Sequence, residues 1–341
     1  MSEHADPRRH LLRLINGFRI SQALHVAAVL RLSDHLAGGP RTVADLAAVT
    51  GCDPHALHRL LRALATAGVY AEAPGGRFAS TAIGDELRGG AEGLGDWAAF
   101  AGAASMWHAW SALGHSIRTG ENAFASVYGE SVWEQRARDP AAGAAFDAAM
   151  AALSRHVAEA VLEAYDFGAL STVADVGGGN GALLAAVLRR HPHLRGHLLD
   201  QPQVVAAAPA LLAAAGVADR CEVHPGDLFV AVPAGADAYV LKSILHDWPD
   251  EAALAIARTC RNAMRPGSVL LVLERVLTGP PYPPADLPAA FSDLNMLVAP
   301  GGQERTRDEY ESLLRAAGLR MTRVVPTTTE FSVIEAVPST S

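Results

Sequence analysis

A short segment in the second half of the chain places an amine, an imidazole, a carboxylate and an indole close together. Residues 237–250 spell DAYVLKSILHDWPD, an apolar run followed by Lys242, His246, Asp247 and Trp248. The run predicts a strand, and open α/β sheets bind ligands at the carboxyl ends of their strands. His246 is therefore a candidate general base, because a neutral imidazole accepts protons near pH 7. The alternatives are a structural histidine and a metal ligand, but no second His or Cys lies nearby at a ligand spacing, so no metal is expected.

A glycine-rich segment earlier in the chain could hold a cofactor. Residues 173–181 spell VADVGGGNG, which predicts a strand, a tight turn and the start of a helix. Glycines let the backbone approach a ligand closely, and the amides that begin the helix point toward it. Gly177, Gly179 and Ala182 also satisfy the loose dinucleotide pattern. The segment therefore leaves NAD(P), S-adenosylmethionine and a purely structural turn open.

Two acidic residues at the ends of the next two predicted strands extend this site. Asp200 ends the strand after the glycine turn, where an acid accepts hydrogen bonds from ribose hydroxyls in either cofactor. Capping of the following helix is the alternative for Asp200. The run Gly226-Asp227-Leu228-Phe229 suits an adenine, with a carboxylate for the exocyclic amine and flat apolar groups for the ring. An NAD site has no particular use for this run, so it favours S-adenosylmethionine.

The elements that must position these residues begin with a helical domain, predicted over residues 1–90. Helical spacing over 10–37 is followed by a helix capped by Thr42, a helix capped by Asp53 and a hairpin around 74–76. This order predicts a winged helix, which serves either DNA binding or dimer formation. Few basic residues stand on its second helix and acids offset them, which favours dimer formation.

The rest of the chain predicts a helical region and then an α/β domain. Residues 91–168 are helical and rich in aromatic side chains, some of which could line an apolar pocket. Residues 169–341 alternate short apolar strands with helices, as in a mostly parallel sheet. Residues 319–325 and 330–337 predict a terminal hairpin with an antiparallel strand, which methyltransferase sheets have and simple dinucleotide folds lack.

The bulk composition excludes several classes of protein. The 341 residues carry a formal net charge of −8, which argues against a general nucleic-acid binder. Three scattered cysteines make no disulfide framework. The polar segment 1–13 has no signal core, and no apolar stretch reaches the ~18 residues of a membrane span. A cytoplasmic protein without membrane or nucleic-acid partners is expected.

Taken together and in order, four motifs resemble those of the plant-type small-molecule O-methyltransferase family, whose bacterial members act in natural-product pathways. They are VGGGNG, LLDQPQV, GDLF and LKSILHDWPD. The resemblance covers nearly the whole chain. It implies a Rossmann-like class I methyltransferase domain with a mostly parallel seven-stranded sheet and an antiparallel terminal strand. An α-helical winged-helix dimerisation domain would precede it, so a homodimer is expected.

The resemblance also implies a reaction and a set of site residues. S-adenosylmethionine would donate a methyl group to a phenolic or enolic hydroxyl of a small aromatic or polyketide-like molecule. The implied cofactor-binding residues are Ser154, Gly177, Gly179, Asp200, Gly226, Asp227, Leu228, Phe229, Lys242 and Trp248. The residues expected at the acceptor are Phe146, Met150, Asp247 and Met296. His246 is the implied base, with Glu274 and Glu304 as its flanking carboxylates.

A carboxylate on the far ring nitrogen of His246 would fix the tautomer and stabilise the imidazolium. Glu304 is the first candidate for this hydrogen bond and Glu274 the second. Salt bridges within the sequence neighbourhood, of Glu304 with Arg305 or Arg307 and of Glu274 with Arg275, are the alternatives. At the level of function, the alternatives are N- or C-methylation on the same scaffold, an NAD(P)-dependent oxidoreductase and a ligand-binding winged-helix regulator.

Overall fold

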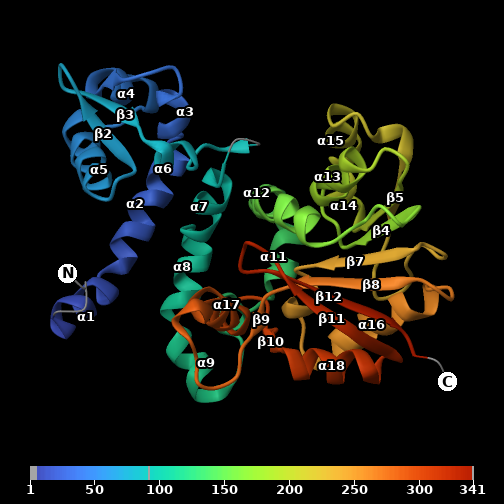
Figure 1. Ribbon diagram of the computed structural model, residues 1–341. Helices are drawn as coiled ribbons and strands as arrows, with labels where there is room; N and C mark the ends of the chain where they lie inside the picture. The colour runs from blue at the N-terminus through green and yellow to red at the C-terminus, as the bar shows by residue number, and fades with distance from the viewer. Residues whose placement is uncertain (1–5, 91–92, 340–341) are drawn as a thin grey trace. The chain divides into compact units, whose positions relative to one another are not determined.

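The computed structural model describes residues 6–90 and 93–339, which form two compact units (Figure 1). The first unit comprises Met1–Trp107 with Ala144–Leu153, and the second comprises His108–Gly143 with Ser154–Ser341. The polar N-terminal segment and the predicted boundary after residue 90 fall partly on residues 1–5 and 91–92, outside the described residues. None of the described helices is both long and apolar enough to cross a membrane.

The first unit contains the predicted helix–turn–helix–hairpin. Its elements are α1 (Pro7–Ile15), α2 (Gly17–Val29), α3 (Leu32–Leu36), β1 (Arg41–Thr42), α4 (Val43–Thr50), α5 (Pro54–Thr66), β2 (Tyr70–Ala73), β3 (Arg77–Ser80), α6 (Ala82–Asp85) and α7 (Gly95–Ala101). Thr42 and Asp45 form a capping box at the start of α4, and Asp53 caps α5 through the amide of Ala56. These contacts confirm both predicted caps. The strands pair antiparallel in the order β1-β3-β2, and β1 was not predicted.

The second unit is an α/β domain preceded by helices. α8 (Ala104–Ser111) and α12 (Pro140–Ala164) each have residues in both units. The other helices are α9 (Leu113–Thr119), α10 (Ala123–Tyr128), α11 (Val132–Arg138), α13 (Ala182–Arg190), α14 (Pro202–Val205), α15 (Ala208–Ala214), η2 (Ala218–Arg220), η3 (Leu245–Asp247), α16 (Asp250–Ala263), η4 (Pro284–Asp286), α17 (Leu287–Val298) and α18 (Arg307–Ala316). The strands are β4 (Thr172–Val176), β5 (Arg195–Asp200), β6 (Cys221–Pro225), β7 (Ala238–Lys242), β8 (Val269–Glu274), β9 (Val276–Leu277), β10 (Arg305–Thr306), β11 (Leu319–Pro326) and β12 (Ser332–Pro338).

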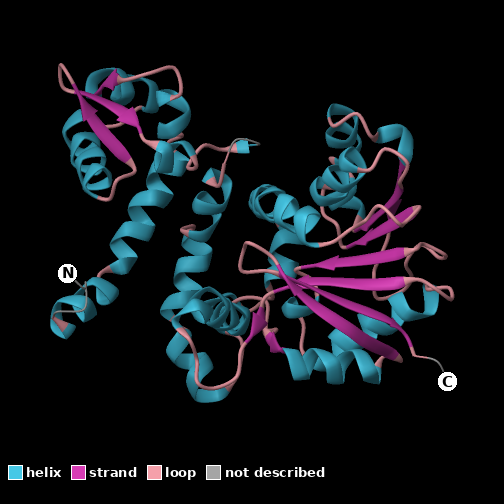
Figure 2. Cartoon of the chain, viewed as in Figure 1, coloured by secondary structure: helices cyan, strands magenta, loops and turns pink. Residues whose placement is uncertain are grey.

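Seven of these strands form one sheet, drawn with the other strands in magenta in Figure 2, and their order is β11-β12-β8-β7-β4-β5-β6. The strands β4, β5, β6, β7 and β8 pair parallel with one another, whereas β12 runs antiparallel to both of its neighbours, β8 and β11. The predicted sheet and its terminal hairpin are thus confirmed. β9 and β10 form a separate two-stranded parallel pair.

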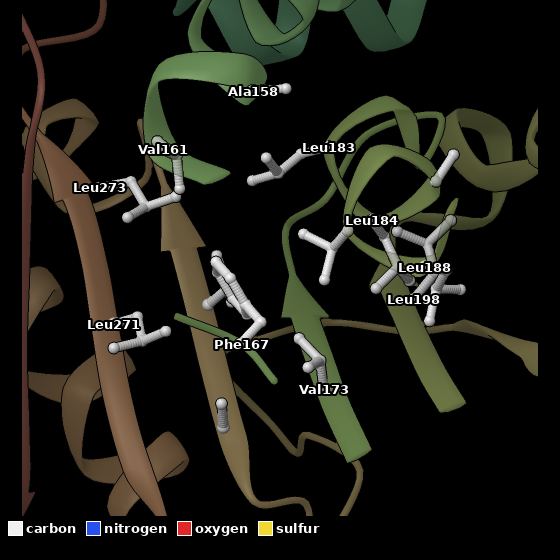
Figure 3. Packing of buried hydrophobic residues seen from close by; sticks show 14 of the residues in the cluster. Ala158, Val161, Phe167, Val173, Leu183, Leu184, Leu188, Leu198, Leu271 and Leu273 are labelled. Carbon is white, nitrogen blue, oxygen red and sulfur yellow. The ribbon is translucent and has the colours of Figure 1, made fainter. Parts of the chain in front are cut away.

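Buried apolar side chains cover both faces of the large sheet. On one face, Val161 of α12 and Leu184 of α13 belong to the same cluster as Leu198 and Leu273 from the strands (Figure 3). On the other face, side chains of α16 and α18 pack against alternate residues of the same strands. Because parallel strands end at one edge, the sheet brings together the residues that follow β4, β5, β7 and β8.

Candidate active site

The loop after β7 is held by the carboxylate that ends β8. Ser243 adopts a left-handed backbone conformation, with φ of 54°, and turns the chain into η3. Glu274 Oε1 accepts hydrogen bonds from the amides of Ile244 at 2.9 Å and Leu245 at 3.0 Å. Glu274 therefore satisfies amides at the start of η3 and fixes the segment that carries His246.

The imidazole of His246 is buried between two carboxylates. Its Nδ1 lies 2.9 Å from Glu304 Oε1 and 3.2 Å from Glu274 Oε2. Its Nε2 lies 3.6 Å from Asp247 Oδ1. His246 is 6% exposed, Glu304 3% and Glu274 0%, so these groups are largely withdrawn from water. Such an arrangement holds the ring in one orientation, with Nδ1 as the nitrogen that contacts the two carboxylates.

Glu304 is itself fixed from a third segment of the chain. Ser292 Oγ on α17 donates a hydrogen bond of 2.7 Å to Glu304 Oε1, and the Glu304 amide donates one of 2.9 Å to Asp293 Oδ1. The Arg275 guanidinium lies 3.9 Å from Glu304. Ser292 and Asp293 were not among the predicted site residues, and no motif around them pointed to this contact.

The alternative in which Glu304 pairs with Arg305 is wrong, because Arg305 points to the loop that carries His246. Its guanidinium donates to the carbonyls of Leu245 and Trp248, each at 2.9 Å, and to Asp250 Oδ1 at 2.8 and 3.0 Å. The Arg305 residue is 1% exposed. Two carbonyls that bracket His246 are thus held by one rigid guanidinium.

The chain just before Glu304 approaches the same loop. The Gln303 amide donates a hydrogen bond of 2.9 Å to the carbonyl of His246. A Cβ on Gly302 would lie 2.0 Å from that carbonyl oxygen, so only glycine fits there. The segment from Gly302 to Arg305 therefore positions both the backbone of His246 and the carboxylate that contacts its ring.

The carboxylates determine the protonation of His246. Burial alone lowers its pKa, but Glu274, Glu304 and Asp247 together raise the pKa of His246 to about 9. Burial raises the pKa of Glu274 to about 7, although His246 opposes the rise. Burial also acts to raise the pKa of Glu304, but His246 and the Ser292 hydrogen bond lower it on balance. Glu304 is thus the charged partner of the imidazolium at neutral pH.

The glycine turn and Asp200 form the predicted cofactor side of the site. Gly177 and Gly179 have φ of 71° and 63°, and a Cβ on Gly177 would lie 2.5 Å from Ile244 Cδ1. Asp200 Oδ2 accepts a hydrogen bond of 2.8 Å from the Gly179 amide, and Oδ1 accepts one of 2.7 Å from Gln201. The carboxylate is therefore tied to the glycine turn, and α14 has no side-chain cap.

The adenine motif lies beside two aromatic side chains. Asp227 Oδ1 accepts a hydrogen bond of 2.9 Å from the Phe229 amide, and the Asp227 residue is exposed. The Trp248 ring meets Phe229 edge-on at 4.9 Å between centroids and stacks on Trp133 at 5.6 Å. Trp133 on α11 was not predicted, because it lies far from the motifs in the sequence. Gly226 donates its amide to the Asp200 carbonyl at 2.9 Å, which joins the two acidic motifs.

Lys242, the chain's only lysine, is the last residue of β7. Its Nζ donates a hydrogen bond of 3.2 Å to Ser243 Oγ. Burial lowers the pKa of Lys242, whereas Glu274 and Asp175 act to raise it. Leu228 also belongs here, because a Cβ on Gly177 would lie 3.4 Å from Leu228 Cδ2.

The remaining predicted residues lie on helices. Ser154 is buried on α12, and Met296 is buried on α17, four residues after Ser292 and hence on the same face. Phe146 and Met150 belong to the part of α12 in the first unit, where Phe146 meets Phe100 edge-on at 5.6 Å. The roles of these four residues toward cofactor or acceptor stay predictions.

Two carboxylates that could serve as metal ligands lie beside His246 in the structure, although the sequence next to His246 offered no second His or Cys ligand. The candidate ligand atoms of His246, Glu274 and Glu304 all lie within 4.8 Å of one another, although the three residues are far apart in the chain. Both carboxylates contact the same ring nitrogen, Nδ1, and Glu274 also serves backbone amides. This arrangement favours proton sharing over chelation.

Two family models match the chain. A model described as O-methyltransferase domain matches residues 110–320, and one described as O-methyltransferase dimerisation domain matches residues 12–88. The phenazine O-methyltransferase PhzM of Lysobacter antibioticus is 42% identical over 330 residues, which cover 96% of this chain and 95% of that protein. The mitomycin biosynthesis 6-O-methyltransferase of Streptomyces lavendulae is 42% identical over 318 residues, which cover 92% and 89%.

Solved structures of proteins related to these O-methyltransferases also match the chain over nearly its whole length. The crystal structure of LaPhzM matches with a TM-score of 0.92 and 41% identity over 98% of this chain and 100% of that one. The O-methyltransferase NcsB1 from neocarzinostatin biosynthesis, in complex with S-adenosylmethionine and 2-hydroxy-5-methyl naphthoic acid, matches with a TM-score of 0.78 and 35% identity over 99% and 100%.

Other relatives catalyse different reactions. The 8-amino-8-demethylriboflavin N,N-dimethyltransferase of Streptomyces davaonensis is 38% identical over 93% of this chain and 91% of that protein. Aclacinomycin 10-hydroxylase RdmB of Streptomyces purpurascens is 39% identical over 95% and 89%. Overall similarity alone therefore does not fix the acceptor atom.

Proposed function

Because the chain belongs to the S-adenosylmethionine-dependent O-methyltransferase family, we propose that it methylates a phenolic or enolic hydroxyl of a small aromatic or polyketide-like natural-product intermediate. His246 is the general base of this reaction. The observation that carries the proposal is the buried 2.9 Å hydrogen bond between His246 Nδ1 and Glu304. An amine acceptor needs such a base less than a hydroxyl does, so the buried histidine–carboxylate pair favours O-methylation over N-methylation.

The residues around the glycine turn fit S-adenosylmethionine. The left-handed backbone of Gly177 favours glycine, and the Asp200 carboxylate, tied to the same turn, can accept hydrogen bonds from ribose hydroxyls. Phe229, Trp248 and the exposed Asp227 offer flat apolar surfaces and an acceptor for adenine. When bound, the cofactor supplies the electrophilic methyl group, so the protein must orient the acceptor oxygen and remove its proton.

The carboxylates prepare His246 for that proton transfer. A phenol has a pKa near ~10, by analogy with tyrosine. Raising the pKa of His246 to about 9 makes Nε2 a stronger base than ordinary imidazole and brings it close to the phenol. Glu304 and Glu274 then stabilise the imidazolium that forms on proton uptake. The cost is that only about a hundredth of the enzyme carries neutral His246 at pH 7.

We further propose that the protein is a homodimer formed through the first unit. Residues 12–88 match a dimerisation model, and no observation favours DNA binding by this domain. Large apolar side chains on α1 and α2 are more than half exposed, including Leu14 at 64% and Ile15 at 58%. A monomer rarely exposes such a stripe. Light scattering should give twice the mass of one chain, and a monomeric mass would reject this proposal.

His246→Ala tests the proposed reaction. We expect the affinity for S-adenosylhomocysteine, measured by calorimetry, to stay nearly unchanged, because the glycine turn and Asp200 are intact. Turnover on a panel of hydroxylated aromatic acceptors should fall by about 10²–10⁴, the usual contribution of a general base. Unchanged turnover would show that positioning, not base catalysis, drives the reaction. Binding of NAD in place of S-adenosylhomocysteine to the unaltered protein would refute the proposed donor.

A further inference from the structure

A second histidine–carboxylate cluster lies on the outermost strands of the large sheet. His197 is on β5, and Glu222 and His224 are on β6, the edge strand. The parallel register pairs His197 with Glu222 and Leu199 with His224. His197 alternates with Leu198, and Glu222 and His224 alternate with Val223, so all three side chains stand on one face of the sheet.

The polar atoms of this cluster converge on one point. His197 Nδ1 lies 3.0 Å from His224 Nε2, 3.7 Å from Glu222 Oε2, and His224 Nε2 lies 3.8 Å from Glu222 Oε1. In a tetrahedral zinc site with bonds near 2.0–2.1 Å, ligand atoms are about 3.3 Å apart. The observed separations bracket this value. Two imidazole nitrogens and a carboxylate are also the ligand set of several zinc sites.

The fold leaves this corner of the sheet open. The connection from β6 to β7, every residue of which the structure describes, contains no helix. The face that α16 and α18 cover at the other strands is therefore accessible here. The side chains of His197 and His224 are 25% and 29% exposed, and that of Glu222 is 69% exposed. An ion from solution can reach the cluster, and a water molecule can complete its coordination.

We propose that His197, Glu222 and His224 bind a divalent transition-metal ion of the zinc class and so link β5 to the edge strand β6. The contact between the two imidazoles can also be a simple hydrogen bond, in which one ring donates to the other. A bound ion would also account for the position of the Glu222 carboxylate, whose two oxygens lie 3.7 and 3.8 Å from the two ring nitrogens. This site is separate from the reaction at His246, for which no metal was expected.

Zinc binding by the full-length, tag-free and chelator-treated protein tests the proposal. Calorimetry with Zn²⁺ should show one ion per chain with a micromolar Kd. His197→Ala and His224→Ala should each weaken binding by at least about tenfold, because each removes a direct ligand. Glu222→Gln should weaken it less, since an amide oxygen remains a weak ligand. His193→Ala is the matched control, because His193 is an exposed histidine whose ring neighbours that of His191 at 6.1 Å. The affinity of the His193→Ala variant for Zn²⁺ should equal that of the unaltered protein.

A second readout guards against variants that fold poorly. Zn²⁺ should raise the unfolding temperature of the unaltered protein and of His193→Ala, but not that of His197→Ala or His224→Ala, because a ligand stabilises only the state that binds it. The proposal is overturned if no saturable Zn²⁺ binding occurs in the micromolar range. It is equally overturned if binding survives in His197→Ala and disappears in His246→Ala, which would place the ion at the other cluster.

Discussion

Among its described residues, the second unit contains two clusters of histidine and carboxylate side chains that differ in burial and in composition. At His246, one buried imidazole faces two carboxylates through a single nitrogen, and its pKa rises to about 9. At His197, a partly exposed imidazole faces a second imidazole, and burial together with His224 lowers its pKa. The same residue type is thus prepared either to take up and hold a proton or to stay neutral, and its neighbours decide which.

The largest change in the free energy of unfolding should come from replacing Arg305, whose side chain holds the loop that carries His246. Arg305→Met leaves the carbonyls of Leu245 and Trp248 without their donor, while Asp250 can turn to water. We expect a loss of about 2–4 kcal/mol in the free energy of unfolding, measured with denaturant. Arg307→Met, in an exposed position, is the control and should cost less than about 0.5 kcal/mol. Equal costs for both variants would show that Arg305 does not hold the loop.

Glu304→Gln tests whether the carboxylate acts through charge. The amide can still accept the His246 Nδ1–H hydrogen bond but no longer stabilises the imidazolium. We expect turnover at the optimum pH to fall by about 10–100-fold and the pKa of His246 to drop, with S-adenosylhomocysteine affinity retained. NMR titration of the ring and single-turnover assays check the two effects. An unchanged pKa would rule out electrostatic coupling between these residues.

The smallest effect is expected at the exposed cluster. In metal-free protein, Glu222→Gln should change the free energy of unfolding by less than about 0.5 kcal/mol, because its side chain is 69% exposed and solvent screens the interaction. Glu274→Gln, at a fully buried position, should cost about 1–2 kcal/mol, because its contacts with His246 and the loop amides are made out of water. Denaturant titration of both variants checks this contrast. Similar costs would mean that burial does not distinguish the two clusters.

Much of the fold could be predicted because its signals are local. The caps at Thr42 and Asp53, the glycine turn at Gly177 and the terminal hairpin each appear within a few residues. Long-range partners gave no such signal. Ser292 and Trp133 reach the site only through helix packing, and the family resemblance, not spacing, pointed to Glu304.

The lack of a local signal for long-range contacts also explains which contacts were mispredicted or missed from the sequence. Arg305 follows Glu304 directly, so a local salt bridge was a reasonable alternative, but the Glu304 carboxylate contacts His246 whereas the Arg305 guanidinium contacts Asp250. His197 and His224 are 27 residues apart on different strands. Only the register between β5 and β6 brings them together, and sequence patterns do not contain that register.

The central claim, that His246 takes the proton of the acceptor hydroxyl, is tested most directly by the pH dependence of methyl transfer. The base form is neutral imidazole, so a pKa raised to about 9 means that the rate should increase with pH until about 9 and then level off. His246→Ala, assayed with the same acceptor, should be much slower and should not level off near pH 9, because only ionisation of the acceptor itself, with a pKa of ~10, then supplies the nucleophile. An identical rise in both proteins, or a plateau beginning near the ordinary histidine pKa of ~6.5, would contradict the claim.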